Sequence, residues 1–490
     1  MIIDSSNAVV PGVQIQAINE DTNIVFSTMT NSSGVYVLPA LPPGRYRLQV
    51  SKAGFATLVK PDIKLDVQDA KAINFTLKVG AASETITVEG GAPLLNTENA
   101  TVGTVVDRQF VENLPLNGRS FQSLFELTPG TVLTQTAFNS PGQFSVNGQR
   151  TDANYFTIDG VSANVGTSGG NGLNQTAGGA IPAFSALGGT SNLVSLDALQ
   201  EFRIQTSSYA PEFGRTPGAQ ISIVTRSGTN ELHGTLFEYL RNDVFDTTDW
   251  FANYNHQPKA KERQSDFGGV LGGPIFKNRL FFFLSYEGLR LRQPQFTSTD
   301  VPSLALRRNA PAQIQPLLNA FPIPNGPDTL PGFSQYSASY SNPAALDAGS
   351  GRLDYAVNEK LTLFGRFDYS PSYATARGKQ GSLNNPNTTE FTTNTATAGM
   401  TWRVSPRLID DLRFNWSRVE GINNASVDDF GGATPFPATL LLPAPFSVKD
   451  SSYSTNLDFS ARNAGLFNGT NSDNIQRQIN LVDNVSVATG

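Results

Sequence analysis

Apolar and polar side chains alternate with a period of two along much of the second half of the chain. In residues 361–369 the odd positions are apolar or glycine and the even positions are mostly polar, and similar alternation recurs in residues 395–403 and 412–417. A period of two is typical of β-strands whose two faces meet different surroundings. From Ala219 onward the pattern therefore predicts long antiparallel strands of about ten residues each.

The predicted connections between these strands alternate in length. Tight turns are expected at residues 356–360 and 405–407, and a long loop is expected at residues 293–349. Short turns on one side and long loops on the other are the organisation of transmembrane β-barrels, in which one strand face contacts lipid and the other lines a polar lumen. Four aromatic side chains near strand ends are expected in the interfacial girdles of such a barrel: Trp402, Trp416, Tyr286 and Tyr369.

The number of predicted strands indicates a part of a larger barrel. About eight strands precede Gly490, whereas plugged outer-membrane transporters have about 22. A closed eight-stranded barrel is the alternative, but side chains would fill its lumen. We therefore expect an N-terminal portion of a longer chain, and the lack of a basic and an apolar region after Met1 suggests a truncated or misassigned start.

The first 80 residues carry shorter β-branched runs separated by turns. This pattern predicts a small β-sandwich. The expected strands are residues 13–18, 24–28, 34–38, 44–50 and 72–77.

Composition excludes several classes of function. Charged residues make up 16% of the chain and aromatic residues 10%, which suits a protein with much apolar surface. A net charge of -6 without basic clusters argues against a nucleic-acid partner. Cysteine is absent, and His233 and His256 lie in no recognisable catalytic or metal-binding motif, so we expect no enzyme activity, no metal site and no cofactor. Because no apolar run reaches about 18 residues, a membrane crossing would have to be a β-barrel.

Three motifs follow one another along the chain: NLPLNGRSF at residues 113–121, FSVNGQRTDANYFTIDGV at residues 144–161, and EFGRTPGAQISIVTRSGTNELHGTLFEYLRN at residues 212–242. Together they resemble the plug of TonB-dependent outer-membrane receptors and its passage into the barrel. The resemblance implies a mainly β protein with an α+β plug at residues 83–228 and the first part of a transmembrane antiparallel β-barrel at residues 229–490.

The N-terminal region has a resemblance of its own. Residues 32–56 resemble the carboxypeptidase regulatory-like (transthyretin-like) domain, which would occupy residues 1–80 and carries no peptidase site. The resemblance implies that residues 34–38 and 46–50 are paired strands, with Pro42-Pro43-Gly44 as the turn. Because starch-binding modules share this fold, carbohydrate binding is one alternative, and a spacer or docking role is the other.

Two sets of site residues follow from the receptor resemblance. The segment Glu84, Thr85, Ile86, Thr87 and Val88 resembles a TonB box, a short extended strand that could add to a sheet edge of an energy-coupling partner. Arg215 is expected to pair with barrel carboxylates and lock the plug, and the early strands offer Glu238 and Glu287.

The resemblance, closest to the Oar-like branch of these receptors, implies energy-coupled import across the outer membrane of a Gram-negative cell. The implied partners are a TonB-type coupling protein, outer-membrane lipid and an extracellular ligand, with siderophores and glycans among the classes; the N-terminal domain would be periplasmic. Ligand binding would act through a conformational shift of the plug. The alternatives are an outer-membrane surface or adhesion protein without transport and, on the first domain alone, a carbohydrate-binding protein.

Overall fold

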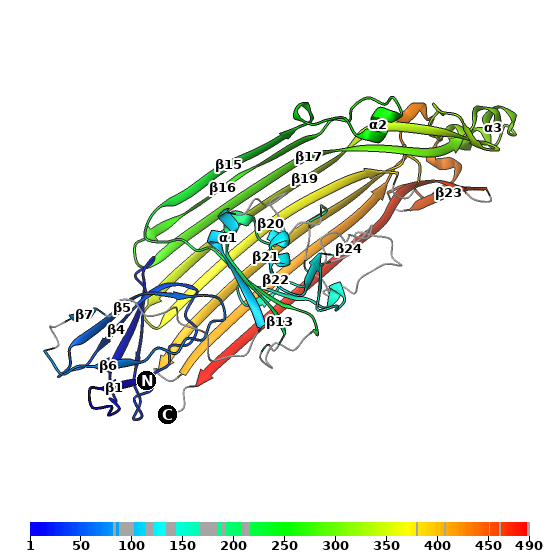
Figure 1. Cartoon of the computed structure of the whole chain (residues 1–490). Coiled ribbons are helices and arrows are strands. Elements are labelled where there is room, and N and C mark those ends of the chain that lie inside the picture. Colours follow the sequence, from blue (N-terminus) through cyan, green and yellow to red (C-terminus); the bar gives the residue numbers. More distant parts are fainter. Residues whose placement is uncertain are drawn as a thin grey trace.

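The chain folds into three consecutive β-rich bodies: a small sandwich, a plug and a broad curved wall (Figure 1). The computed structural model describes residues 1–81, 85–87, 102–113, 121–133, 144–166, 182, 185–187, 193–207, 209, 216–378, 381–405, 408–449, 451–459 and 462–487. No helix within these ranges has the length and apolarity needed to cross a membrane.

The described part of the sandwich has seven short strands. Its main sheet has the order β3-β2-β4-β5-β7, and β1 pairs in parallel with β6. Alternate residues of the central strands, such as Ile15, Ala17, Leu48 and Val50, are buried in one core. The strands are β1 (Ile2–Asp4), β2 (Gln14–Asn19), β3 (Val25–Met29), β4 (Gly44–Ser51), β5 (Thr57–Leu65), β6 (Phe75–Leu77) and β7 (Thr85–Thr87).

One predicted strand pairing is wrong. Residues 34–38 form no strand, and β4 pairs instead with β2 and β5. Gly34 lies in a turn with φ of 71°, and its amide donates to the carbonyl of Asn31 at 3.0 Å. The prolines at positions 39, 42 and 43 have no amide hydrogen to donate to a ladder. The segment is held by separate contacts instead of a ladder: the amide of Ile2 donates to the carbonyl of Gly34 at 2.8 Å, and the Tyr36 hydroxyl donates to the carbonyl of Ile73 at 2.8 Å.

The plug is built around a mixed sheet of order β12-β11-β14-β13-β8, in which β11 and β14 are parallel. Its core contains a cluster of phenylalanines, in which the ring of Phe125 lies 4.7 Å from Phe144 and 5.4 Å from Phe202 between centroids. The elements are β8 (Val102–Asp107), α1 (Arg108–Asn113), η2 (Phe121–Leu127), β9 (Thr131–Leu133), β10 (Phe144–Val146), η3 (Thr151–Ala153), β11 (Tyr155–Ile158), β12 (Val161–Ser162), η6 (Leu196–Ala198), β13 (Leu199–Ser207) and β14 (Gln220–Thr225).

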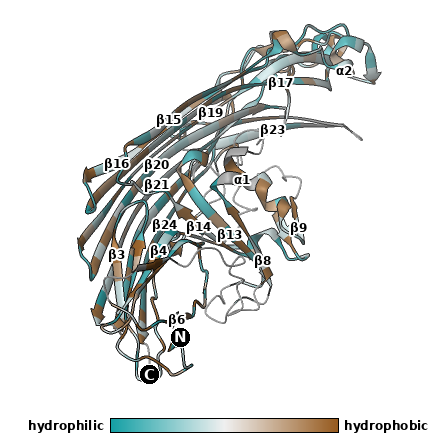
Figure 2. Cartoon of the chain, turned by 60° about the vertical axis from the view of Figure 1, so that its left-hand side comes forward, coloured by the Kyte–Doolittle hydropathy of each residue, from teal (hydrophilic) through white to brown (hydrophobic). Residues whose placement is uncertain are grey.

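The wall is an antiparallel sheet of order β15-β16-β17-β19-β20-β21-β22-β24-β23, with short β18 paired to β19. The plug lies against its concave face (Figure 2). Its strands are β15 (His233–Asn242), β16 (Arg263–Phe276), β17 (Leu280–Pro302), β18 (Asp328–Leu330), β19 (Phe333–Asn358), β20 (Leu361–Arg377), β21 (Pro386–Ser405), β22 (Leu408–Ala425), β23 (Ser452–Phe459) and β24 (Arg462–Val487). Its helices, in the long connections, are η7 (Asp243–Phe245), α2 (Trp250–Tyr254), α3 (Leu304–Asn309), α4 (Gln315–Asn319), η8 (Phe430–Gly432) and η9 (Ala438–Leu440).

Most of the wall strands are longer than the predicted ten residues. β17 has 23 residues and β19 has 26, so the expected loop at residues 293–349 is reduced to the connection between Pro302 and Phe333. Ser, Thr and Tyr side chains continue the alternation beyond the apolar band, and the ladder of β17 with β19 is unbroken from Leu280↔Tyr355 to Pro302↔Phe333. The hydrogen-bonded hairpin therefore extends past the membrane-spanning part.

The predicted girdle residues lie at two levels of the wall. Tyr286 and Tyr369 both align with Gly349, so they share one level, and Trp402 aligns with Leu361 beside the short turn. These three aromatic side chains are between 43% and 49% exposed. Trp416 is half-buried.

The sandwich contacts the plug through the end of β5 and through residues 66–71, which follow it. Arg203 of β13 donates to the Asp69 carboxylate at 2.6 Å and to the Gln68 carbonyl at 2.9 Å. Lys64 forms an ion pair with Asp107 of β8 at 2.6 Å. The contact is thus made of charged and polar groups, and it joins the sandwich to two neighbouring strands of the plug sheet.

A buried carboxyl group lies in the middle of this contact. Glu201 of β13 is 3% exposed and accepts a hydrogen bond from the amide of Val67. Burial, together with the nearby carboxylate of Asp66, raises the pKa of Glu201 to about 8. Because the docked state binds a proton more tightly than a solvated glutamate does, docking is favoured most below the ordinary pKa and weakens as the pH rises through about 8.

We expect this contact to loosen between about pH 5 and pH 8, the interval bounded by the ordinary and the raised pKa. The chain has no cysteine, so Val35→Cys and Phe110→Cys, two exposed positions in sandwich and plug, can carry a spin-label pair. The distance distribution should broaden with rising pH in the otherwise native protein. Glu201→Gln, which mimics the protonated acid, should keep it narrow throughout; equal broadening in both proteins would contradict the assignment.

Candidate functional site

The tip of one plug hairpin carries a charged residue that contacts the wall. β11 and β12 are joined by Asp159-Gly160, with Ile158 paired to Val161. Both turn residues have positive φ, 50° and 86°, as a two-residue turn of type I′ requires, and Asp-Gly is among the preferred sequences for it. The hairpin therefore fixes the place of the Asp159 carboxylate at the edge of the plug.

Asp159 is tied to both the plug and the wall. Within the plug it accepts hydrogen bonds from the amide of Thr225 at 3.0 Å and from its hydroxyl at 2.9 Å. From the wall it meets Arg366 at 2.8 Å and Arg352 at 3.3 Å. The Asp159 side chain is 4% exposed and that of Arg366 only 2%, so the contact is buried.

The two arginines lie directly opposite each other on β19 and β20. Like charges in this arrangement repel. Each guanidinium is therefore held by an aspartate two residues along its own strand: Arg352 by Asp354 at 2.8 Å and Arg366 by Asp368 at 2.9 Å. The carboxylate of Asp159 bridges the pair. We call Arg352 and Arg366, with these two aspartates, the arginine socket.

The charge of Asp159 depends on the socket. Burial alone would raise the pKa of the carboxyl group, but Arg366, Arg352 and the Thr225 hydrogen bonds outweigh burial and hold its pKa below the usual range. Asp159 is therefore ionised. Removing one partner of such a buried pair costs about 3 to 5 kcal/mol, because the other charge is left uncompensated.

The remaining plug–wall contacts combine apolar and weaker polar interactions. The plug core includes three wall residues, Val270, Phe283 and Val419. The amide of Ala186 donates to the hydroxyl of Ser372 at 3.0 Å, and Arg226 lies 4.9 Å from the centre of the Phe283 ring. In the described parts of the chain, no cluster of acidic and histidine side chains is suited to a metal ion. Together, the ionic, polar and apolar contacts hold the plug against the wall.

The structure describes two of the three predicted lock residues. Arg215 lies outside the described residues, so its pairing remains a prediction. Glu287 of β17 is 2% exposed, whereas Glu238 of β15 is exposed and accepts from Ser265 at 3.0 Å. The register aligns Glu287 with Gly268 and Glu238 with Phe267, which places the two glutamates on opposite faces of the wall. Of the two, only Glu287 lies on the plug side.

The predicted TonB box is also partly described. Glu84 and Val88 lie outside the described residues, while the intervening three residues form β7. β7 pairs in parallel with β5, with Ile86 aligned to Leu58 and packed against the sandwich core. The segment is thus an edge strand of the sandwich in this structure.

The sequence did not predict the arginine socket. The Asp-Gly turn is visible there, but as an ordinary hairpin signal it does not indicate a partner. In the sequence Arg366 is only one polar position of an alternating strand. The register of β19 with β20, which sets Arg352 opposite Arg366, is the signal that could have identified the pair.

Comparisons with known proteins agree with this architecture. Residues 224–490 match the model of the outer membrane beta barrel domain, and residues 1–78 match that of the carboxypeptidase regulatory-like domain. The chain is 28% identical over 359 residues to the TonB-dependent transporter Oar of Myxococcus xanthus, covering 70% of this chain. It spans 29% of the length of that relative.

One solved structure shares the fold of this chain, and others are similar to it. The outer membrane transporter YddB from Escherichia coli superimposes with a TM-score of 0.51 at 12% identity, over 78% of this chain and 45% of that chain. The siderophore receptor PirA from Acinetobacter baumannii gives a TM-score of 0.41 at 15% identity, over 69% of this chain and 43% of that chain. The protein is an Oar homologue of the Gram-negative outer membrane, and it belongs to the outer membrane beta-barrel family.

Proposed function

We propose that this protein is an energy-coupled outer-membrane transporter that imports an extracellular ligand by rearranging its plug. The observation that carries the proposal is the Asp159 contact, in which a single plug carboxylate fills a socket of two opposed wall arginines. A plug built to move needs contacts that hold it in one state and can be broken. The role is one of binding and transport, without catalysis.

The wall surface around the socket supports a movable plug. Among the buried positions of the strands that face the plug, many are polar, including Ser285, Ser370, Asn415 and Ser417 in the strands beside or near the socket. Water can replace such contacts with little net loss, because a typical hydrogen bond contributes only about 1 kcal/mol. An interface of this kind can open at lower cost than an apolar core of equal area.

We propose β7 and its neighbours Glu84 and Val88 as the coupling segment. The strand occupies the edge of the sandwich sheet beside β5, and edge strands are suited to exchange with a strand of another protein. β5 leads directly into residues 66–71, which contact the plug. Removal of β7 by a periplasmic coupling protein would therefore act on the strand that connects the sandwich with the plug. In this proposal residues 1–80, 83–228 and 229–490 are the periplasmic domain, plug and barrel part.

Replacing Ile86 tests the coupling segment. Ile86→Pro removes the amide hydrogen needed for strand addition. In a pull-down with the periplasmic domain of the coupling protein, the intact receptor should bind and the proline variant should lose at least about tenfold in affinity, or about 1.4 kcal/mol. Ile86→Ala, which keeps the amide hydrogen, is the matched control and should retain binding.

Either of two results would contradict the coupling proposal. Equal binding of Ile86→Pro and the wild type would place the coupling segment elsewhere. A folded wild-type receptor that binds no coupling protein would favour the alternative function, an outer-membrane surface or adhesion protein that transports nothing.

Replacing Asp159 tests the lock. Asp159→Asn keeps the shape of the side chain but leaves the two arginines without their bridging charge, so docking of the plug should weaken by about 3 to 5 kcal/mol. Cells that carry this variant should admit large antibiotics excluded by the wild type. Asp152→Asn, at an exposed plug position, is the control, and cells that carry it should exclude these antibiotics as the wild type does. Unchanged permeability and unchanged plug stability in Asp159→Asn would rule out the lock.

A further inference from the structure

A second pair of directly opposed arginines lies on the outer face of the wall. Arg263 of β16 is paired with Arg292 of β17, and both side chains are exposed. Arg290, two residues along β17, shares their face because side chains alternate along a strand. Three guanidinium groups therefore gather on neighbouring strands, and we call them the arginine cluster.

The cluster has an excess of positive charge. Arg290 is paired with Asp347 at 2.8 Å. Across the part of the chain that the structure describes, neither Arg263 nor Arg292 has an ion pair. Like charges directly opposite on two strands are destabilising. In the arginine socket a carboxylate of the plug relieves this repulsion, whereas on the outer face no carboxylate of the described residues pairs with Arg263 or Arg292, since Asp347 pairs with Arg290. An anion from outside the protein would neutralise these opposed positive charges.

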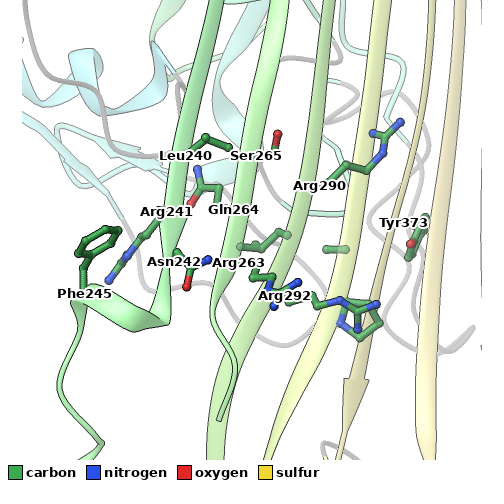
Figure 3. A pocket seen from close by; sticks show the side chains of 13 residues that line it. Leu240, Arg241, Asn242, Phe245, Arg263, Gln264, Ser265, Arg290, Arg292 and Tyr373 are labelled. Carbon is green, nitrogen blue, oxygen red and sulfur yellow. The ribbon is translucent and has the colours of Figure 1, made fainter. Parts of the chain in front are cut away.

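The cluster borders a hollow of suitable size and character. The hollow has a volume of about 550 Å³, and Figure 3 shows side chains from several adjacent strands around it. Its lining joins Arg263, Arg290 and Arg292 with apolar side chains that include Leu240 and Phe245, which are 75% and 90% exposed. A ligand that fits this lining has an anionic group and an apolar part.

The position of the cluster relative to the membrane indicates the source of such a ligand. On the same face of β17, Leu280, Phe282 and Leu284 lead to Tyr286 and then to Arg290 and Arg292. Arg290 lies ten residues beyond the strand start at the short turn, which is about 34 Å along the strand and about 25 Å along the barrel axis at the usual tilt. The apolar band of such barrels is about 25 Å tall, so the cluster lies at the level of the outer-leaflet headgroups.

We propose that the arginine cluster binds the phosphate group of an outer-leaflet membrane lipid, with the acyl chains lying along the apolar band below. Guanidinium groups suit this ligand because their fork of donors matches phosphate oxygens in a bidentate geometry. Basic pockets at the headgroup level are a recurrent means of recognising anionic lipids. The site is separate from the path of any imported ligand, since it faces away from the plug.

The test is binding of a defined lipid to the intact receptor in a zwitterionic detergent, measured by native mass spectrometry. Bisphosphorylated lipid A should be retained by the wild type, whereas lipid A with both phosphates removed should bind at least about tenfold more weakly. The double variant Arg263→Gln with Arg292→Gln should lose the preference for the phosphorylated form. Arg263→Lys with Arg292→Lys keeps the charges but removes the bidentate fork, so it should retain only part of that preference.

Two controls make the result specific. Arg279→Gln removes an arginine at the short-turn end of the same sheet, where it lies 5.7 Å from the Tyr355 ring, and should leave lipid retention unchanged. Each variant must also show the heat-sensitive gel mobility of a folded barrel. The proposal is overturned if the double glutamine variant retains bisphosphorylated lipid A like the wild type, or if inorganic phosphate at equal concentration displaces the lipid.

Discussion

The rest of the structure depends on backbone hydrogen bonding in the wall. A strand that crosses a membrane has to satisfy its amide and carbonyl groups with neighbouring strands, because lipid offers no partners. The ladder between β17 and β19 does this without interruption over all 23 residues of β17. Since side chains alternate along each strand, the same ladder creates an apolar outer face and a polar inner face. The plug, the girdles and both arginine pairs take their positions from it.

Strand register places two arginines directly opposite each other at two positions of the wall, one on each face. Register places Arg352 opposite Arg366 on the inner face and Arg263 opposite Arg292 on the outer face. Each pair concentrates positive charge that favours an anion between its members. On the inner face that anion is Asp159, which belongs to the plug. On the outer face the proposed anion is a lipid phosphate. The chemistry is the same, and only the face of the sheet decides which partner is within reach.

The sandwich is directly connected to the plug. β5 is paired with β7 along its first residues and runs into the segment that contacts the plug. The contact itself contains Glu201, whose raised pKa links docking of the sandwich to protonation. A domain that could have been an inert spacer therefore touches both the proposed coupling strand and the plug. This arrangement favours a docking role for the domain over an independent carbohydrate-binding role.

Local patterns in the sequence were sufficient for the fold class, because strand alternation and turn chemistry depend on residues close together in the chain. The period of two correctly indicated the wall and its two faces, and the plug motifs indicated the body that lies against it. Local patterns gave wrong strand predictions where the structure of a segment depends on residues distant in the sequence. Residues 34–38 have β-rich composition, yet prolines and a turn exclude them from the ladder, and the wall strands run on because partner strands continue beside them.

The candidate site depended almost entirely on tertiary structure. Asp159 and Arg366 are 207 residues apart, and nothing near either one specifies the other. The same holds for Glu201 and Val67, which are 134 residues apart. The sequence determined that Asp159 sits at the tip of a tight turn, because Asp-Gly accepts the positive φ angles that the turn requires. Only the packing of the plug against a particular register of β19 and β20 decided that this carboxylate would meet two arginines.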